Sequence, residues 1–129
     1  MKRIALVLLI ATGLLRAPAS AHHSFAAEFD ATKKVTLTGV VTKVEWTNPH
    51  VWFWVNVKDE TTGDVVNWGA EMGSPNALSR TGWTVNTMTV GMIVSFTGSR
   101  AKDGSSTVNT STVLVNGRKL GAASSEGAN

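Results

Sequence analysis

The chain has 129 residues and contains no cysteine and no tyrosine. Without cysteine it has no disulfide, no thiolate nucleophile and no cysteine to which a lipid could be attached after export. The stability of the folded protein must therefore come from its packed core. A chain of this length provides for a single domain.

From His22 onward the sequence also lacks an excess of charge of either sign. The formal net charge of +3 comes from Lys2, Arg3 and Arg16, because nine basic and nine acidic residues balance from His22 onward. A domain without net positive charge lacks the attraction to phosphate on which binding to nucleic acids and anionic membranes depends. We therefore expect no nucleic-acid partner.

The motifs of common enzyme classes are absent from the sequence. There is no Gly-x-Ser-x-Gly nucleophile motif and no glycine-rich phosphate-binding motif. The nine acidic residues are scattered, mostly in expected turns, so their spacing forces no pair of carboxylates together. The sequence therefore favours a non-enzymatic protein without deciding the question, and we assign no catalytic residue.

The first 21 residues have the three-part pattern of a secretory signal peptide. Lys2 and Arg3 precede an apolar run over 4–15, and small residues follow over 17–21. The apolar run is too short to span a bilayer, which needs about 20 residues. We predict cleavage after Ala21, with a cut after Ala19 as the alternative. The mature protein is expected in the periplasm or outside the cell, with no membrane attachment.

The remainder of the chain predicts an all-β fold. An N-terminal arm over 22–34 precedes strands expected at 35–46, 51–58, 65–72, 91–98 and 110–115. Ser74 and Pro75 predict the start of a short helix over 76–81, between the third and fourth strands. This order predicts a five-stranded OB-like small barrel over 35–120, with a small open β-sandwich as the alternative. The polar residues 121–129 predict a disordered tail.

The first expected strand changes its apolar phase. Val35 and Leu37 occupy odd positions, whereas Val40 and Val44 occupy even ones. A phase change across Gly39 predicts a β-bulge or a bend. Such a bend would allow one long strand to serve both halves of a barrel.

The three histidines, His22, His23 and His50, are the candidate metal ligands. If His22 becomes the first residue, its α-amine and imidazole can chelate one ion, and His23 or His50 can add a third nitrogen. Amine and imidazole nitrogens in a tetragonal arrangement favour Cu(II), so copper is the expected cofactor. A cut after Ala19 would instead create an amino-terminal x-x-His chelate. The alternative is that the two terminal histidines form only a polar junction and that His50 caps a turn.

The tryptophans are the candidate ligand-binding residues. In the second strand Val51 and Phe53 alternate with Trp52 and Trp54, so these indoles should point away from the core. Together with Trp68 they could stack on a planar small molecule or contact a protein partner, including a second copy of the chain. Alternatively, phenylalanines of the arm at positions 25 and 29 fold back and cover them.

Three segments resemble a family of small secreted proteobacterial proteins of unassigned function. They are His-His-Ser-Phe-Ala-Ala-Glu-Phe-Asp at 22–30, Trp-Thr-Asn-Pro-His at 46–50 and Trp-Gly-Ala-Glu-Met-Gly-Ser-Pro-Asn at 68–76. The resemblance covers residues 22 to 120. It implies an exported β-barrel-like domain and includes all three histidines.

These observations order three hypotheses about function. The first is an exported, non-enzymatic protein that binds a metal ion, with Cu(II) favoured. The second is a module that binds an organic ligand or a protein through its tryptophan face. The third is a copper-dependent oxidoreductase in which the amino-terminal histidine activates oxygen.

Overall fold

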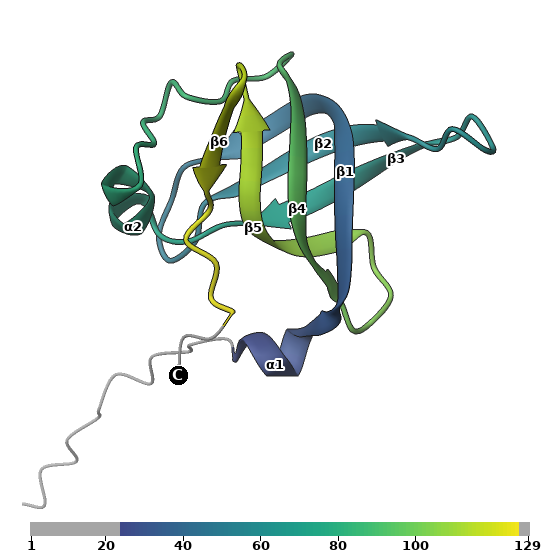
Figure 1. Cartoon of the computed structure of the whole chain (residues 1–129), viewed down its shortest axis with the longest axis horizontal. Helices are drawn as coiled ribbons and strands as arrows, with labels where there is room; N and C mark the ends of the chain where they lie inside the picture. The colour runs from purple at the N-terminus through teal and green to yellow at the C-terminus, as the bar shows by residue number, and fades with distance from the viewer. Residues whose placement is uncertain (1–23, 127–129) are drawn as a thin grey trace, which may run out of the picture.

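A computed structural model of the chain describes residues 24–126. Figure 1 shows a curved sheet with two short helices at its margins. The elements in chain order are α1 (Phe25–Glu28), β1 (Phe29–Glu45), β2 (Trp52–Lys58), β3 (Val65–Glu71), α2 (Pro75–Arg80), β4 (Ile93–Ala101), β5 (Thr107–Val115) and β6 (Arg118–Gly121). The mainly β composition and the helix between the third and fourth strands are confirmed.

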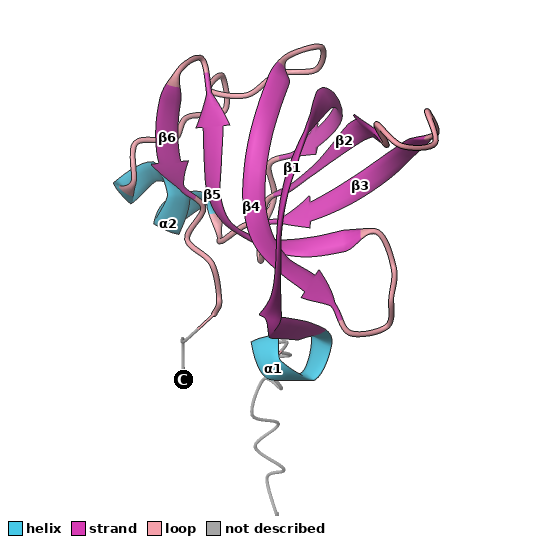
Figure 2. Ribbon diagram, turned by 45° about the vertical axis from the view of Figure 1, so that its right-hand side comes forward, coloured by secondary structure: helices cyan, strands magenta, loops and turns pink. Residues whose placement is uncertain are grey.

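The strands form one six-stranded sheet in the order β3-β2-β1-β4-β5-β6. All neighbours in this order are antiparallel. An additional parallel pairing joins β3 to β5 through the rows Gly69–Thr107, Ala70–Val108 and Glu71–Asn109. Strands β1, β2, β3, β5 and β4 are therefore linked in a closed ring of pairings, which curves the sheet around its core (Figure 2).

Five strands were expected from the sequence, and this number is wrong, because the sheet has six. Asn116 and Gly117 have φ angles of 49° and 74°, as a type I′ hairpin turn requires. The turn leads into β6, which pairs antiparallel with β5. This strand was missed because its four residues contain a single large apolar side chain, that of Leu120.

The tail predicted to be disordered is ordered as far as Glu126. Ala122 is fully buried, its N–H donates to the Ser111 carbonyl over 2.9 Å, and its own carbonyl accepts from Gly73 N–H over 2.8 Å. Glu126 forms an ion pair with Lys34. Small polar residues give no hydrophobic pattern, so sequence reasoning could not detect this backbone pairing. Residues 127–129 lie outside the described part of the chain.

Strand β1 is the long, bent strand that the sequence predicts, but its phase changes at a different residue. It pairs with β4 as far as Val40 and with β2 from Val40 onward, and its register shifts between Val41 and Lys43. Val41 is therefore buried and Val40 is exposed, the reverse of the prediction. Gly39 has another role, because a Cβ there would lie 2.0 Å from the Asn56 carbonyl oxygen.

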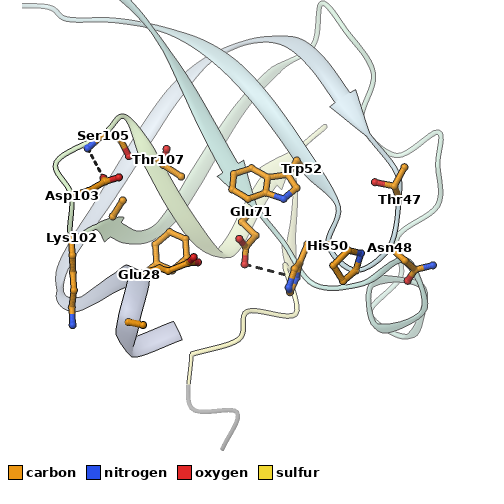
Figure 3. A pocket seen from close by; sticks show the side chains of 14 residues that line it. Glu28, Thr47, Asn48, His50, Trp52, Glu71, Lys102, Asp103, Ser105 and Thr107 are labelled. Carbon is orange, nitrogen blue, oxygen red and sulfur yellow. Dashed lines mark hydrogen bonds and ion pairs between the residues drawn. The ribbon is translucent and has the colours of Figure 1, made fainter. Parts of the chain in front are cut away.

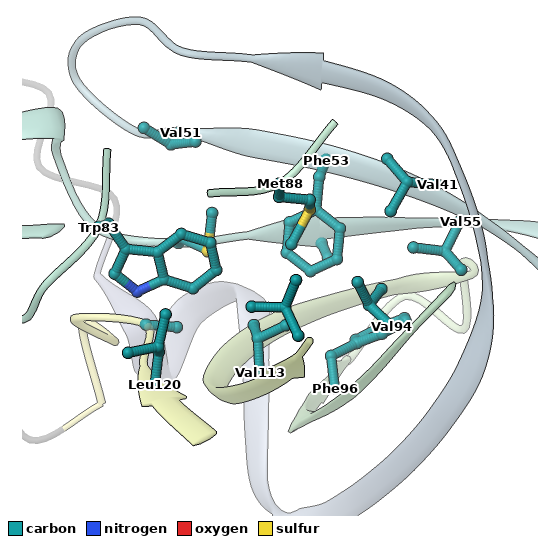
Figure 4. Close-up of a cluster of buried hydrophobic side chains, with 14 of the residues drawn as sticks. Val41, Val51, Phe53, Val55, Trp83, Met88, Val94, Phe96, Val113 and Leu120 are labelled. Carbon is teal, nitrogen blue, oxygen red and sulfur yellow. The ribbon is translucent and has the colours of Figure 1, made fainter. Parts of the chain in front are cut away.

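The core fills the inside of the curved sheet (Figure 4). Phe53 and Phe96 meet edge to face, with ring centroids 5.3 Å apart. Leu78 of α2 and Trp83 cover one end of this core, with exposed fractions of 0% and 2%. Ser74 caps α2 by accepting the Ala77 N–H over 3.2 Å, as predicted. No helix within residues 24–126 is long and apolar enough to cross a membrane.

The arm predicted over 22–34 is shorter than expected, because β1 already begins at Phe29. Before β1, residues 25–28 of the arm form α1, whose C-terminal end is held by the loop after β4. The Lys102 N–H donates to the Glu28 carbonyl over 2.8 Å, and the Lys102 ammonium donates to the Ala26 carbonyl. The expected signal peptide, His22 and His23 lie outside the described residues.

Candidate functional site

A pocket of about 620 Å³ lies between α1, the turn before β2 and the loop between β4 and β5 (Figure 3). Its lining includes Glu28, Phe29, His50, Trp52, Glu71 and Lys102. Two of the residues that the sequence singled out, His50 and Trp52, therefore share one cavity.

His50 is fixed at the rim of the pocket by backbone pairing on its C-terminal side. The Val51 N–H donates to the Gly73 carbonyl over 3.0 Å, and Val51 accepts from the Met72 N–H over 2.8 Å. The imidazole Nδ1 of His50 lies 3.0 Å from the Met72 carbonyl oxygen. A carbonyl only accepts, so Nδ1 carries the proton and Nε2 of the neutral ring keeps its lone pair. This tautomer suits a metal ligand that coordinates through Nε2.

Glu71 is a buried carboxylate in this lining, with an exposed fraction of 4%. Its Oε1 lies 3.8 Å from Nδ1 of His50 and accepts a hydrogen bond from the Asn109 side chain over 3.2 Å. Asn109 is held in turn by the hydroxyls of Ser124 and Ser125. The ordered C-terminal segment thus supports, through Asn109, the carboxylate beside His50.

Trp52 and Trp54 project from the face of β2 opposite the core, as predicted. Their rings stack at a centroid distance of 6.0 Å and an angle of 23°. They lie over Gly69 of β3, where an added Cβ would be 3.2 Å from Nε1 of Trp54. The Lys43 ammonium lies 4.7 Å from the Trp54 ring centroid, so a cation of the protein itself already occupies the Trp54 ring. Of the pair, Trp52 alone lines the pocket.

Trp68 does not join this pair. It is paired across β2 and β3 with Val55, a core residue, and it packs against the core. The Arg100 guanidinium carbon lies 5.1 Å from its ring centroid. Because successive residues of a strand face opposite sides, Trp68 lies on the other face of β3 from Gly69, over which Trp52 and Trp54 stack.

Trp52 is neither fully exposed to solvent nor completely covered by the arm. Phe25 and Phe29 stack on each other at a centroid distance of 5.7 Å, and Phe29 is buried. Phe29 and Trp52 both line the pocket, so the cavity separates part of the arm from the indole. The residues of the arm thus help to form a binding cavity on the tryptophan side of β2.

The lining carries more negative than positive charge. Glu28, Glu71 and Asp103 contribute three carboxylates, and Lys102 contributes one ammonium. Hydrogen bonds from the Ser105 side chain and backbone lower the pKa of Asp103 below its ordinary value of 3.8. Asp103 is therefore ionised at neutral pH, and carboxylates outnumber ammonium groups among the lining residues.

Within residues 24–126, no three histidine or carboxylate side chains are grouped so that they could hold a metal ion. The structure therefore brings His50 together with one carboxylate, that of Glu71, rather than with a complete ligand set. His22 and His23, the other predicted ligands, precede the described residues.

Sequence reasoning missed Glu71 and Asn109 as members of this site. The one available signal for Glu71 was its position at the end of an otherwise uncharged strand, in the segment 68–76 used for the resemblance. Asn109 meets Glu71 only through the parallel pairing of β3 and β5. That contact depends on the closure of the sheet, which no local pattern encodes.

Comparison with known proteins places these residues in a family. A family of unknown function, DUF6152, matches residues 10–110. The chain belongs to this family. No curated protein and no solved structure matches the chain. Function must therefore be inferred from the site itself.

Proposed function

We propose that this DUF6152 protein is exported and binds one metal ion, with Cu(II) favoured, through Nε2 of His50 and nitrogens of His22 and His23. The hydrogen bond between Nδ1 of His50 and the Met72 carbonyl carries the proposal. This bond fixes the ring and leaves Nε2 as the coordinating atom at the edge of a pocket with excess negative charge.

The position of the arm supports the participation of the amino terminus. Ala27 and Glu28 line the same pocket as His50. His23 stands four residues before Ala27, and such a length of chain spans at most about 14 Å. The terminal nitrogens are thus within reach of the pocket. Cleavage after Ala21 would add the α-amine of His22, which a metal can deprotonate at neutral pH.

The fold supports the proposal of a binding protein rather than an enzyme. We interpret the closed ring β1-β2-β3-β5-β4, with α2 between β3 and β4, as an OB-like barrel extended by β6. In such barrels the strand-2 and strand-3 surface and the adjoining loops bind ligands, and the pocket lies at this surface. We assign the residues of the pocket to binding and none to catalysis.

Copper titration of the exported protein tests the metal proposal, after its intact mass has located the amino terminus. We expect one equivalent of Cu(II) to bind, and both His50→Ala and a form that retains Ala21 to weaken binding on the order of tenfold or more. Asp64→Asn, in the loop between β2 and β3, is the matched control and should bind normally. Equal affinity of wild type, His50→Ala and the extended form would refute the proposal.

A second candidate function, binding of an organic ligand or a protein, is favoured by the stacked indoles of Trp52 and Trp54. Trp54→Ala removes one of the two stacked rings but no lining residue of the pocket. If ligand binding uses this face, Trp54→Ala should weaken it while leaving Cu(II) affinity unchanged. Unchanged ligand binding in this variant would exclude the tryptophan face.

A further inference from the structure

The pocket is much larger than a single metal ion requires. Its volume of about 620 Å³ lies within the range of roughly 300–1,000 Å³ that is typical of small-molecule sites. Its lining is more apolar than polar, with Phe29, Pro49 and Trp52 among the residues that form it. The cavity therefore has the size and walls of a site for an organic molecule.

The charged residues of the lining favour a molecule with a positive charge. The lining residues include three carboxylates, those of Glu28, Glu71 and Asp103, and one ammonium, that of Lys102, which donates to the Ala26 carbonyl on the arm. Glu71 is the most buried of the three, with 4% exposure. A carboxylate held away from water gains the most from a cationic partner, because its charge is weakly screened there.

The indole of Trp52 lies next to this carboxylate. Trp52 and Glu71 are direct partners across β2 and β3, so their side chains emerge on the same face of the sheet. Figure 3 shows both in the pocket wall, with His50 beside Glu71. An indole face and a carboxylate side by side form a standard recognition unit for ammonium and guanidinium groups.

We propose that the pocket binds a small organic cation, a primary amine with a compact apolar body. The ammonium group lies between the carboxylate of Glu71 and the face of Trp52, and the apolar body lies toward Phe29 and Pro49. This inference uses the pocket of the proposed function but needs neither the metal nor His22 and His23. The two proposals can therefore fail separately.

The test uses the exported protein in the presence of EDTA and three probes of similar shape. These are phenethylamine, the neutral 2-phenylethanol and the anionic phenylacetate, with binding followed through the indole N–H signals in NMR spectra. We expect phenethylamine to bind at least tenfold more tightly than the other two and to shift the Trp52 signal. Equal affinities for the three probes, or no binding of the amine, would overturn the proposal.

Two variants assign the binding to this site. Glu71→Gln removes the charge but keeps the shape, and it should weaken amine binding tenfold or more, whereas Glu60→Gln in the β2–β3 loop should have no effect. If the buried substitution prevents folding, Trp52→Leu is the second variant and should weaken binding at least fivefold. Unchanged amine affinity in a folded Glu71→Gln or Trp52→Leu protein would contradict the assignment. Cu(II) titration of wild type without EDTA then reports on the metal proposal alone.

Discussion

The two short helices lie against different parts of the same sheet and have different roles: α2 packs on the core, and α1 lines a cavity. Helix α2 has a capped amino terminus, and Leu78 and the following Trp83 are buried in the core. Helix α1 has no side-chain cap and no buried residue, and it is held through contacts with Lys102. Apolar side chains on and after α2 thus cover one end of the core, whereas α1 forms one wall of the cavity.

This difference indicates that the residues that stabilise the domain and those of the candidate site lie on different sides of the sheet. Beside α2 the buried groups are apolar, and the indole N–H of Trp83 is satisfied by the Gly121 carbonyl over 2.8 Å. Beside the cavity the fold retains a buried carboxylate, Glu71, and a buried amide, Asn109. Burying such groups costs free energy unless they are paired. Their retention next to a pocket suits binding better than it suits stability.

The largest expected effect is at the α2 side. Trp83→Ala should lower the free energy of unfolding by about 3–5 kcal/mol, because it empties a filled core position and removes the indole donor to the Gly121 carbonyl, which then keeps the Thr81 hydroxyl as a donor. Phe25→Ala on α1 is the matched change and should cost about 1 kcal/mol, since Phe25 is half-buried and stacks on Phe29. Urea denaturation measures both. A larger loss in Phe25→Ala would reverse the comparison.

The next effect concerns the polar network behind the cavity. Asn109→Ala removes the hydrogen bonds to Glu71, Ser124 and Ser125, and it should cost about 1–3 kcal/mol because the buried Glu71 carboxylate loses a hydrogen-bond donor. Asn67→Ala removes the hydrogen bonds of an exposed amide and is the control, with an expected cost below about 0.5 kcal/mol. Equal losses in the two variants would show that the network adds nothing.

The two helix caps give a smaller and closely matched contrast. Ser74→Ala should cost about 1 kcal/mol, because the hydroxyl accepts the Ala77 N–H. Ser24→Ala should leave the stability unchanged within error, since the Ser24 side chain makes no capping hydrogen bond. The melting temperatures of both variants provide the measurement, and a destabilised Ser24→Ala protein would contradict the account.

The smallest effect is electrostatic and lies at the rim of the pocket. Because hydrogen bonds from Ser105 lower the pKa of Asp103, its ionised form stabilises the fold above its ordinary pKa of 3.8. This contribution fades as the pH falls through the lowered pKa of the folded state. Asp103→Asn should therefore melt slightly below wild type at pH 6 and at the same temperature near pH 2. A difference that persists at pH 2 would contradict this cause.

Local patterns in the sequence were sufficient for much of the fold. The alternation in β2 and the Ser74 cap each depend on a few adjacent residues, and both occur as predicted. The bend of β1 was foreseen, but its phase change was assigned to Gly39 instead of the bulge after Val41. A glycine can indicate a bulge or a close backbone approach, and only the position of β2 decides between them.

The site was less accessible from the sequence, because its parts come from distant segments. His50 and Trp52, which the sequence named as a candidate metal ligand and a candidate ligand-binding residue, both line the pocket. Trp68 was grouped with Trp52 and Trp54, although it faces the core. Glu71 and Asn109 meet through the closure of the sheet, and Ser124 joins them from a segment predicted to be disordered. Contacts of this kind follow from topology rather than from local periodicity.

The most direct test of the account uses Cu(II) as a paramagnetic probe of the five indole N–H signals. Addition of up to one equivalent of Cu(II) to the exported protein should broaden the signal of Trp52, which lines the pocket together with His50. In His50→Ala, which lacks a proposed ligand, the same addition should leave the Trp52 signal much sharper. Equal broadening of the Trp52 signal in the two proteins, or no broadening of Trp52 in wild type at one equivalent, would contradict the account.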